Sequence, residues 1–190
     1  PTLYLRRHLG TSSQAVDSML DADFTDIGTN HRHRGCAKTV ARLDMLVGYE
    51  EVWDGRAPAN ISAVIRGKKV YDPRLDSTFS GSWGTGSGAH RVNDPTTWAW
   101  SRNPALCWAD YRIDSDLGPG WATNRINYNS VAIAADACDT LVSIPSTTEK
   151  RFQCDFVTDT SFEPAEIIDQ ILASMFGNQR YIAGQWHVFA

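Results

Sequence analysis

The segment that most constrains the fold lies near the C-terminus, over residues 164–176. Its apolar residues recur at intervals of three and four: Ile167, Ile168, Ile171, Leu172, Met175 and Phe176. This spacing puts them on one face of an α-helix, and such a face must be buried against another element. Glu163 and Glu166 favour the positive end of a helix dipole, and Gly177 is suited to a helix end. We therefore predict an amphipathic helix over residues 164–176.

Other helices are predicted further upstream. Asn103 and Pro104 are a typical helix start, and four residues follow at helical spacing: Leu106, Cys107, Asp110 and Tyr111. Residues 130–142, capped by Asn129 or Ser130, form another helix with one apolar face: Val131, Ala134, Ala135, Cys138, Leu141 and Val142. A short helix is expected over residues 14–20, after a loop rich in hydroxyl groups. The chain thus predicts three to four short helices.

Strands are predicted on both sides of these helices. Residues 36–47 alternate loosely between apolar and polar and are expected to pair with residues 61–66. A hairpin is expected within residues 61–71, turning at its Gly-Lys pair. A strand over residues 151–158 and a hairpin over residues 181–189 flank the C-terminal helix. The expected fold class is α+β, with mixed small sheets and hairpins.

Residues 76–94 are rich in Gly, Ser and Thr. We expect a flexible loop here, because such residues bury too little surface to offset the entropy of ordering them. A phosphate-binding loop is not indicated, since the Gly-Lys-Ser/Thr ending is missing. We expect residues 1–190 to form a single fragment, with this loop as the boundary if it has two lobes. The N-terminal part is then β-rich and the C-terminal part α+β.

Bulk composition narrows the function classes. Apolar residues make up 42% and charged residues 21% of the chain, as in folded soluble proteins. The net charge of -4 argues against a general nucleic-acid binder, which needs a concentrated basic surface. There is no apolar run long enough for a membrane span. Because the chain begins at Pro1 and ends on a strand-like segment, we expect it to be a piece of a longer protein.

The cysteines form no paired ligand motif. Four are widely spaced: Cys36, Cys107, Cys138 and Cys154. We expect buried free thiols, with disulfides as the alternative. His31, His33 and Cys36 are three potential zinc ligands within one short loop, but a closed tetrahedral site needs a fourth. A basic surface loop is the preferred interpretation, and we expect no metal and no cofactor.

Several blocks of the sequence resemble one protein family. They are residues 61–74, which include Arg66-Gly67-Lys68-Lys69-Val70-Tyr71-Asp72-Pro73-Arg74; residues 94–111; residues 132–139; and residues 150–156 with 163–168 and 184–188. In this order they resemble the phage and prophage tail-tip proteins of the lambda host-specificity family. The resemblance covers about residues 31–190. Thr140 replaces the family's usual acid, and Asp155-Phe156 replaces its Asn-Gly turn.

The resemblance implies a structural role. Members are central tail hub proteins, commonly homotrimers, that contact other tail-tip and tail-tube proteins. It thus implies a component of the virion tail tip, assembled in the host cytoplasm and taking part in tail assembly and host attachment. Interfaces are enriched in aromatic residues and Arg, so candidate interface positions can be chosen: Trp53, Tyr71, Arg74, Trp83, Trp98 and Trp100. We expect no catalytic residue.

Two other functions remain as alternatives. A tail-associated cell-wall hydrolase would use paired carboxylates near a Trp, such as Asp114 and Asp116 near Trp121, or Glu50 and Glu51 near Trp53. A receptor- or carbohydrate-binding module would instead use the Gly/Ser-rich segment and its aromatic residue, Trp83. Abnormally titrating acids would favour the hydrolase. Loss of glycan binding on deletion of residues 80–88 would favour the binding module.

Overall fold

The computed structural model describes residues 2–34, 36–44 and 64–190. The chain divides into two compact units, Pro1–Val64 and Ile65–Ala190. The expected boundary at residues 76–94 is therefore displaced, because this segment lies inside the second unit. We refer to the two parts as the first unit and the second unit.

The first unit is built on one antiparallel strand pair. Strand β1 (Thr2–Leu9) pairs along its whole length with β2 (Ala37–Asp44), for example Leu5 with Ala41. The prediction of a strand within residues 36–47 is confirmed over β2. Its predicted pairing with residues 61–66 is not found in the described part of the chain, where β1 is the partner of β2. Residues 61–63 lie outside the described part, and residues 64–66 are not in a strand.

A short helix, α1 (Ser18–Asp23), follows β1. Asp17 caps it by accepting hydrogen bonds from the backbone N–H groups of Met19 and Leu20. The helix predicted over residues 14–20 therefore begins four residues late. Gln14 lies before the helix. Its side chain accepts from the backbone N–H of Gly10 and donates to the carbonyls of Arg32 and His33.

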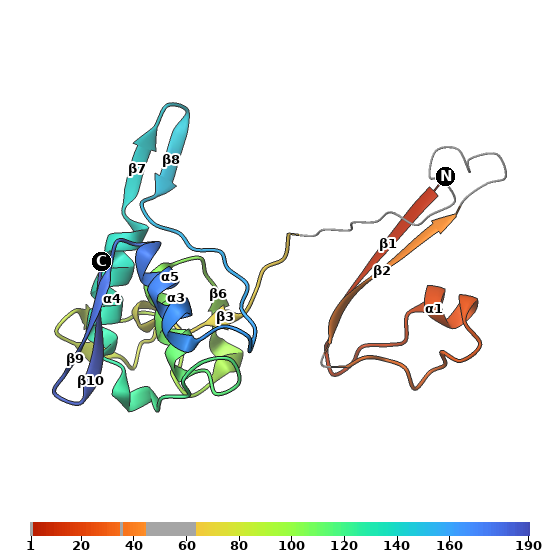
Figure 1. The fold of residues 1–190 in the computed structure, drawn as a ribbon, viewed down its shortest axis with the longest axis horizontal. Coiled ribbons are helices and arrows are strands. Elements are labelled where there is room, and N and C mark those ends of the chain that lie inside the picture. The colour runs from red at the N-terminus through yellow and green to blue at the C-terminus, as the bar shows by residue number, and fades with distance from the viewer. Residues whose placement is uncertain (1, 35, 45–63) are drawn as a thin grey trace. The chain divides into compact units, whose positions relative to one another are not determined.

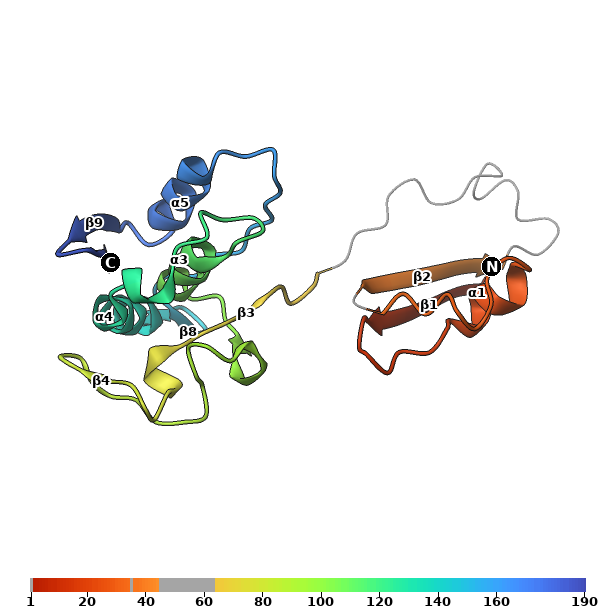
Figure 2. The same cartoon turned by 90° about the horizontal axis from the view of Figure 1, so that it is seen from below.

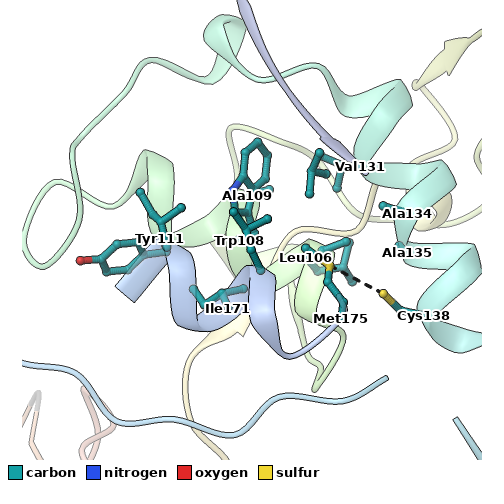
Figure 3. Packing of buried hydrophobic residues seen from close by; sticks show 14 of the residues in the cluster. Leu106, Trp108, Ala109, Tyr111, Val131, Ala134, Ala135, Cys138, Ile171 and Met175 are labelled. Carbon is teal, nitrogen blue, oxygen red and sulfur yellow. Dashed lines mark hydrogen bonds between the residues drawn. The ribbon is translucent and has the colours of Figure 1, made fainter. Parts of the chain in front are cut away.

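Three helices form the core of the second unit. They are α3 (Pro104–Ile113), α4 (Tyr128–Asp139) and α5 (Pro164–Ala173), and α3 contacts both others. Figure 3 shows their apolar side chains meeting, with Leu106 and Trp108 of α3 between α4 and α5. The start of α3 is as predicted, since Asn103 caps it through the N–H of Ala105. The helical spacing of apolar residues therefore identified the three core helices.

The end of α4 differs from the prediction. The helix stops at Asp139, and the chain continues into a hairpin of β7 (Leu141–Ile144) and β8 (Thr147–Lys150). Leu141 and Val142, predicted on the helix face, are exposed strand residues. All eight residues of the hairpin are exposed, and it extends away from the helices (Figure 1). Cys138 is thus the last buried residue of α4.

The end of α5 also lies earlier than predicted. Ile167, Ile171 and Met175 are buried as expected, but Phe176 is 89% exposed and adopts φ 51°. This left-handed residue ends the helical hydrogen bonding, and the N–H of Gly177 bonds to the carbonyl of Leu172. A Cβ at Gly177 would lie 2.5 Å from a backbone oxygen, so close packing requires glycine there.

The remaining strands are short. The predicted C-terminal hairpin is confirmed as β9 (Asn178–Ile182) and β10 (Gln185–Phe189), turning at Ala183 and Gly184, both with positive φ. The predicted strand over residues 151–158 is wrong, since that segment has no regular structure. The expected hairpin within residues 61–71 is also wrong in its described part. There β3 (Lys69–Val70) pairs with β6 (Ala99–Trp100).

Between β3 and β6 lie two 3-10 turns, η1 (Pro73–Leu75) and η2 (Pro95–Thr97), and the small pair β4 (Ser80–Gly81) and β5 (Gly84–Thr85). A third turn, η3 (Thr123–Arg125), precedes α4. Figure 2 shows the β4 segment beside α4. The predicted α+β class is confirmed, with helices against small two-stranded sheets. In the described ranges, none of the helices combines the length and apolar character that a bilayer crossing needs.

Candidate functional site

A pocket in the second unit gathers charged and aromatic side chains from η1, β6, β8, α4 and the β4–β5 segment. We call it the Arg74 pocket. Its polar and aromatic lining consists of Asp72, Arg74, Trp83, His90, Trp100, Ser101, Asp136, Asp139 and Lys150. Three of these residues were candidate interface positions from the sequence, namely Arg74, Trp83 and Trp100. The pocket is therefore the place where the structure brings the predicted positions together.

Arg74 is the centre of this pocket. Asp72 caps η1 through the N–H of Arg74 and also accepts from its guanidinium, with Nη2 to Oδ2 at 2.8 Å. The other guanidinium bonds reach α4, at 3.0 Å to Asp136 and 2.9 Å to Asp139. Burial lowers the pKa of Arg74, but its bonds to these carboxylates outweigh that effect and raise it. A single cation therefore connects η1 to α4.

Two acids of α4 receive this cation because they lie three residues apart, on one helix face. Asp139 is also 2.6 Å from Nζ of Lys150 on β8. Burial raises the pKa of Asp139, but its bonds from Lys150 and Arg74 prevail and keep it below its usual range. The base of the projecting hairpin is thus tied to the same network.

The aromatic walls of the pocket differ in exposure. The indole N–H of Trp83 donates to Asp136 at 2.6 Å, and its backbone N–H donates to Asn129. Trp100 is 39% exposed, and the Arg66 guanidinium lies 5.0 Å from its ring centroid. Trp83 is held against α4, whereas Trp100 presents ring surface to solvent.

Tyr71 and Trp98 are not part of the pocket lining, and both are buried. Their ring centroids are 6.3 Å apart, and Tyr71 also meets Tyr128 edge to face at 5.2 Å. The side chains of these two candidates therefore form part of the interior. Trp53, the remaining candidate, lies outside the described residues.

The Gly/Ser-rich segment is ordered, contrary to the expectation of a flexible loop. Asp76 organises it, accepting from Thr78, from the Tyr71 hydroxyl at 2.9 Å and from Arg91 at 3.0 Å. Burial raises the pKa of Asp76, but these bonds outweigh it and lower the pKa. Backbone bonds from Gly86 to Phe79 and from Ser87 to Arg74 complete the fold of the segment. Composition missed this because the ordering depends on one buried carboxylate.

A substitution at Gly86 tests this packing. A Cβ built there would lie 2.3 Å from the carbonyl oxygen of Asp76 and 2.4 Å from that of Pro73. We expect Gly86→Ala to lower the free energy of unfolding by about 2 kcal/mol, because backbone must shift to admit the methyl group. Gly67→Ala, where no atom lies within 4 Å, is the matched control and should stay close to wild type. Equal urea midpoints for the two variants would show that the segment is not packed as described.

The acids considered for hydrolysis are placed apart from the Arg74 pocket's lining. Asp114 caps the loop after α3 through the N–H groups of Asp116 and Leu117, and lies 2.7 Å from Lys68 Nζ. Burial raises the pKa of Asp114, but these bonds prevail and set it at about 2. A general acid needs the opposite shift. Asp116 is exposed, and Glu50, Glu51 and Trp53 lie outside the described residues.

The His-x-His-x-x-Cys loop is engaged in local bonds. Nδ1 of His31 accepts from the N–H of Gly28, and His33 is bonded to Lys38 at 2.7 Å. Among the residues with described positions, no three His, Cys, Asp or Glu side chains are grouped to hold a metal ion. Cys36 is exposed and Cys138 buried, so the expectation of buried thiols is wrong for Cys36.

What the Arg74 pocket offers chemically is a set of side chains that hold one another in fixed positions. The three carboxylates of the lining share two cations, Arg74 and Lys150, so each carboxylate is already paired. The sequence did not identify Asp136, Asp139 or Lys150 as members. The spacing of Asp136 and Asp139, three residues apart on a predicted helix, was a signal that could have identified these two acids. No protein-family model matches the chain, and no curated protein is significantly similar to it.

Proposed function

We propose that this chain is a structural component of the tail tip, or central hub, of a long-tailed phage or prophage. In this role it acts through interfaces with tail-tip and tail-tube proteins, and the full-length protein is a homotrimer. It takes part in tail assembly and host attachment. The basis is the ordered resemblance of its sequence blocks to the tail-tip family.

One structural observation carries the proposal: the blocks that resemble the family are bonded to one another. Arg74 of the first block binds Asp136 and Asp139 of the third. Asn103 of the second donates to the carbonyl of Ala135, again in the third, at 2.9 Å. Side chains that carry the resemblance thus maintain the architecture of the second unit, as suits a scaffold protein.

Exposed features of the second unit support an interface role. The β7–β8 hairpin has solvent-exposed residues on both strands, and an isolated hairpin of this length is marginally stable in water. Its unpaired edges can add to a neighbouring sheet. Trp100 offers an aromatic ring at the mouth of the Arg74 pocket, the kind of anchor that protein interfaces favour.

The direct test is to locate the chain in particles. Antibodies raised against it should label the distal end of the tail in gold-labelled electron micrographs of the phage or induced prophage that encodes it. Particles from a host with the coding segment deleted are the control and should carry no label. Labelling of heads or tail shafts, or particles that never contain the chain, would contradict the proposal.

Trp100 gives a residue-level test. We expect Trp100→Ala to lower the titre of infectious particles about tenfold or more, because an exposed aromatic anchor is lost from an interface. Trp100→Phe keeps an aromatic ring and should restore most of the titre. The thermal midpoint of the purified chain should fall by a few degrees at most in either variant, so the chain stays folded. An unchanged titre for Trp100→Ala would remove Trp100 from the interface.

A further inference from the structure

Two of the four cysteines lie side by side in the second unit. Cys107 is in the first turn of α3, and its Sγ is 3.9 Å from the carbonyl oxygen of Ser101. Cys154 lies in the irregular segment between β8 and α5, and its N–H donates to the carbonyl of Arg102 at 2.9 Å. Both residues are therefore fixed at the turn that enters α3. There the two side chains are close enough for each thiol to change the pKa of the other.

The exposure of this pair fits a reactive site. Cys107 and Cys154 are both half-buried, whereas Cys138 is fully buried. Cys138 instead lies 3.9 Å from the sulfur of Met175 in the apolar core, as Figure 3 shows. A small solute can therefore reach the Cys107–Cys154 pair more readily than it can reach Cys138.

The surroundings favour charge on one thiol of the pair. The neighbouring Cys107 thiol lowers the pKa of Cys154, against burial and the charge of Asp155, which raise it; Ser174 and Arg102 also lower it. The Cys154 thiol, together with burial, raises the pKa of Cys107. Because the thiolate is the attacking species in thiol–disulfide exchange, Cys154 is the nucleophile and Cys107 the resolving thiol.

We propose that Cys107 and Cys154 are a redox-active dithiol that closes to an intramolecular disulfide by exchange with a low-molecular-weight disulfide such as oxidised glutathione. The Cys154 thiolate attacks one glutathione sulfur, the glutathione S–S bond breaks, and one glutathione thiolate leaves. Cys107 then loses its proton and attacks the Cys154 sulfur, releasing the second glutathione thiolate. Two electrons pass to the small disulfide, and the two cysteine protons end on two glutathione thiols.

The bond would join α3 to the segment between β8 and α5. That segment has no regular structure, and its backbone is attached to α3's entry turn through Cys154. A crosslink between residues so far apart in sequence restricts the unfolded chain, and so raises the stability of the unit. This inference is independent of the proposed tail-tip role, because it rests on the placement of Cys107 and Cys154 at the entry turn of α3.

The test uses the full chain equilibrated with oxidised and reduced glutathione. Under oxidising conditions the number of thiols that titrate in denaturant should fall from four to two. Peptide mapping without reduction should recover the Cys107 and Cys154 peptides joined to each other. The thermal midpoint of the second unit should rise by about 10 °C relative to the reduced protein.

Three variants separate the steps. Cys36→Ser, with the exposed cysteine removed, should form the bond like wild type. Cys107→Ser should stop at the mixed disulfide, with one glutathione on Cys154, and Cys154→Ser should form neither product. Four titratable thiols in the oxidised wild type, or a bond that involves Cys138 or a second chain, would overturn the proposal. The wild-type peptide map decides the question even if a variant fails to fold.

Discussion

Replacing Trp108 by Ala is expected to lower the free energy of unfolding of the second unit by about 4 kcal/mol. The Trp108 side chain is fully buried between α4 and α5 (Figure 3), so its removal leaves a cavity that neighbouring helices cannot fill without moving. The substitution also removes the bond from its indole N–H to Gln179, which is 2.9 Å long. Arg112 is also buried, and its guanidinium lies 5.0 Å from the centroid of the Trp108 ring, so the substitution removes an aromatic neighbour of this cation.

Urea unfolding followed by far-ultraviolet circular dichroism measures this loss. Trp100→Ala is the matched control, since it removes the same side chain from a site where the ring is 39% exposed. It should cost about 1 kcal/mol or less, because surface substitutions leave little unfilled space. Similar losses for the two variants would mean that Trp108 is not the centre of the core.

The helices of the second unit could be predicted because their information is local. The apolar spacing in residues 164–176 and the Asn103-Pro104 start each specify structure within a few turns. The ends of these helices were less predictable, since they depend on contacts with other parts of the chain. Phe176 adopts the left-handed conformation at the helix end, whereas the close approach of a backbone oxygen requires glycine at position 177.

Strand pairing was predicted poorly because it depends on distant partners. The β-rich pattern of residues 36–47 was visible, but nothing in it distinguishes β1 from residues 61–66 as a partner. Val70 likewise pairs with Ala99 across the ordered Gly/Ser-rich segment. Short strands carry too few alternating positions to specify pairing, so tertiary contacts decide it.

The Arg74 pocket was predicted only in part, for the same reason. Aromatic and Arg enrichment at interfaces identified Arg74, Trp83 and Trp100, but equally Tyr71 and Trp98, which the fold buries. Composition cannot separate an interior ring from an exposed one. Besides the neighbouring Asp72, the acids that bind Arg74 are Asp136 and Asp139 of α4, more than sixty residues later in the chain. Only the folded chain shows that they converge.

Replacing Arg74 by Met is expected to cost about 3 kcal/mol at pH 7, the second largest effect. Met keeps most of the aliphatic length but leaves the carboxylates of Asp72, Asp136 and Asp139 without their shared cation. The side chains of Asp72 and Asp139 are only 10% and 21% exposed, so water replaces the cation poorly. The control is Arg102→Met, which breaks an ion pair with Asp155 at an exposed site and should leave stability unchanged within error.

The pH dependence of this loss has a defined sign. Burial raises the pKa of Asp139, but Lys150 and Arg74 keep it below its usual range. Its contribution is therefore fully present above the unfolded-state pKa of about 4 and is lost as the pH falls through the lower folded-state pKa. The difference in unfolding free energy between wild type and Arg74→Met should be constant from pH 7 to about 5 and narrow below about 4. A difference that persists undiminished at pH 3 would show that Arg74 stabilises the unit by packing and not through the charge of Asp139.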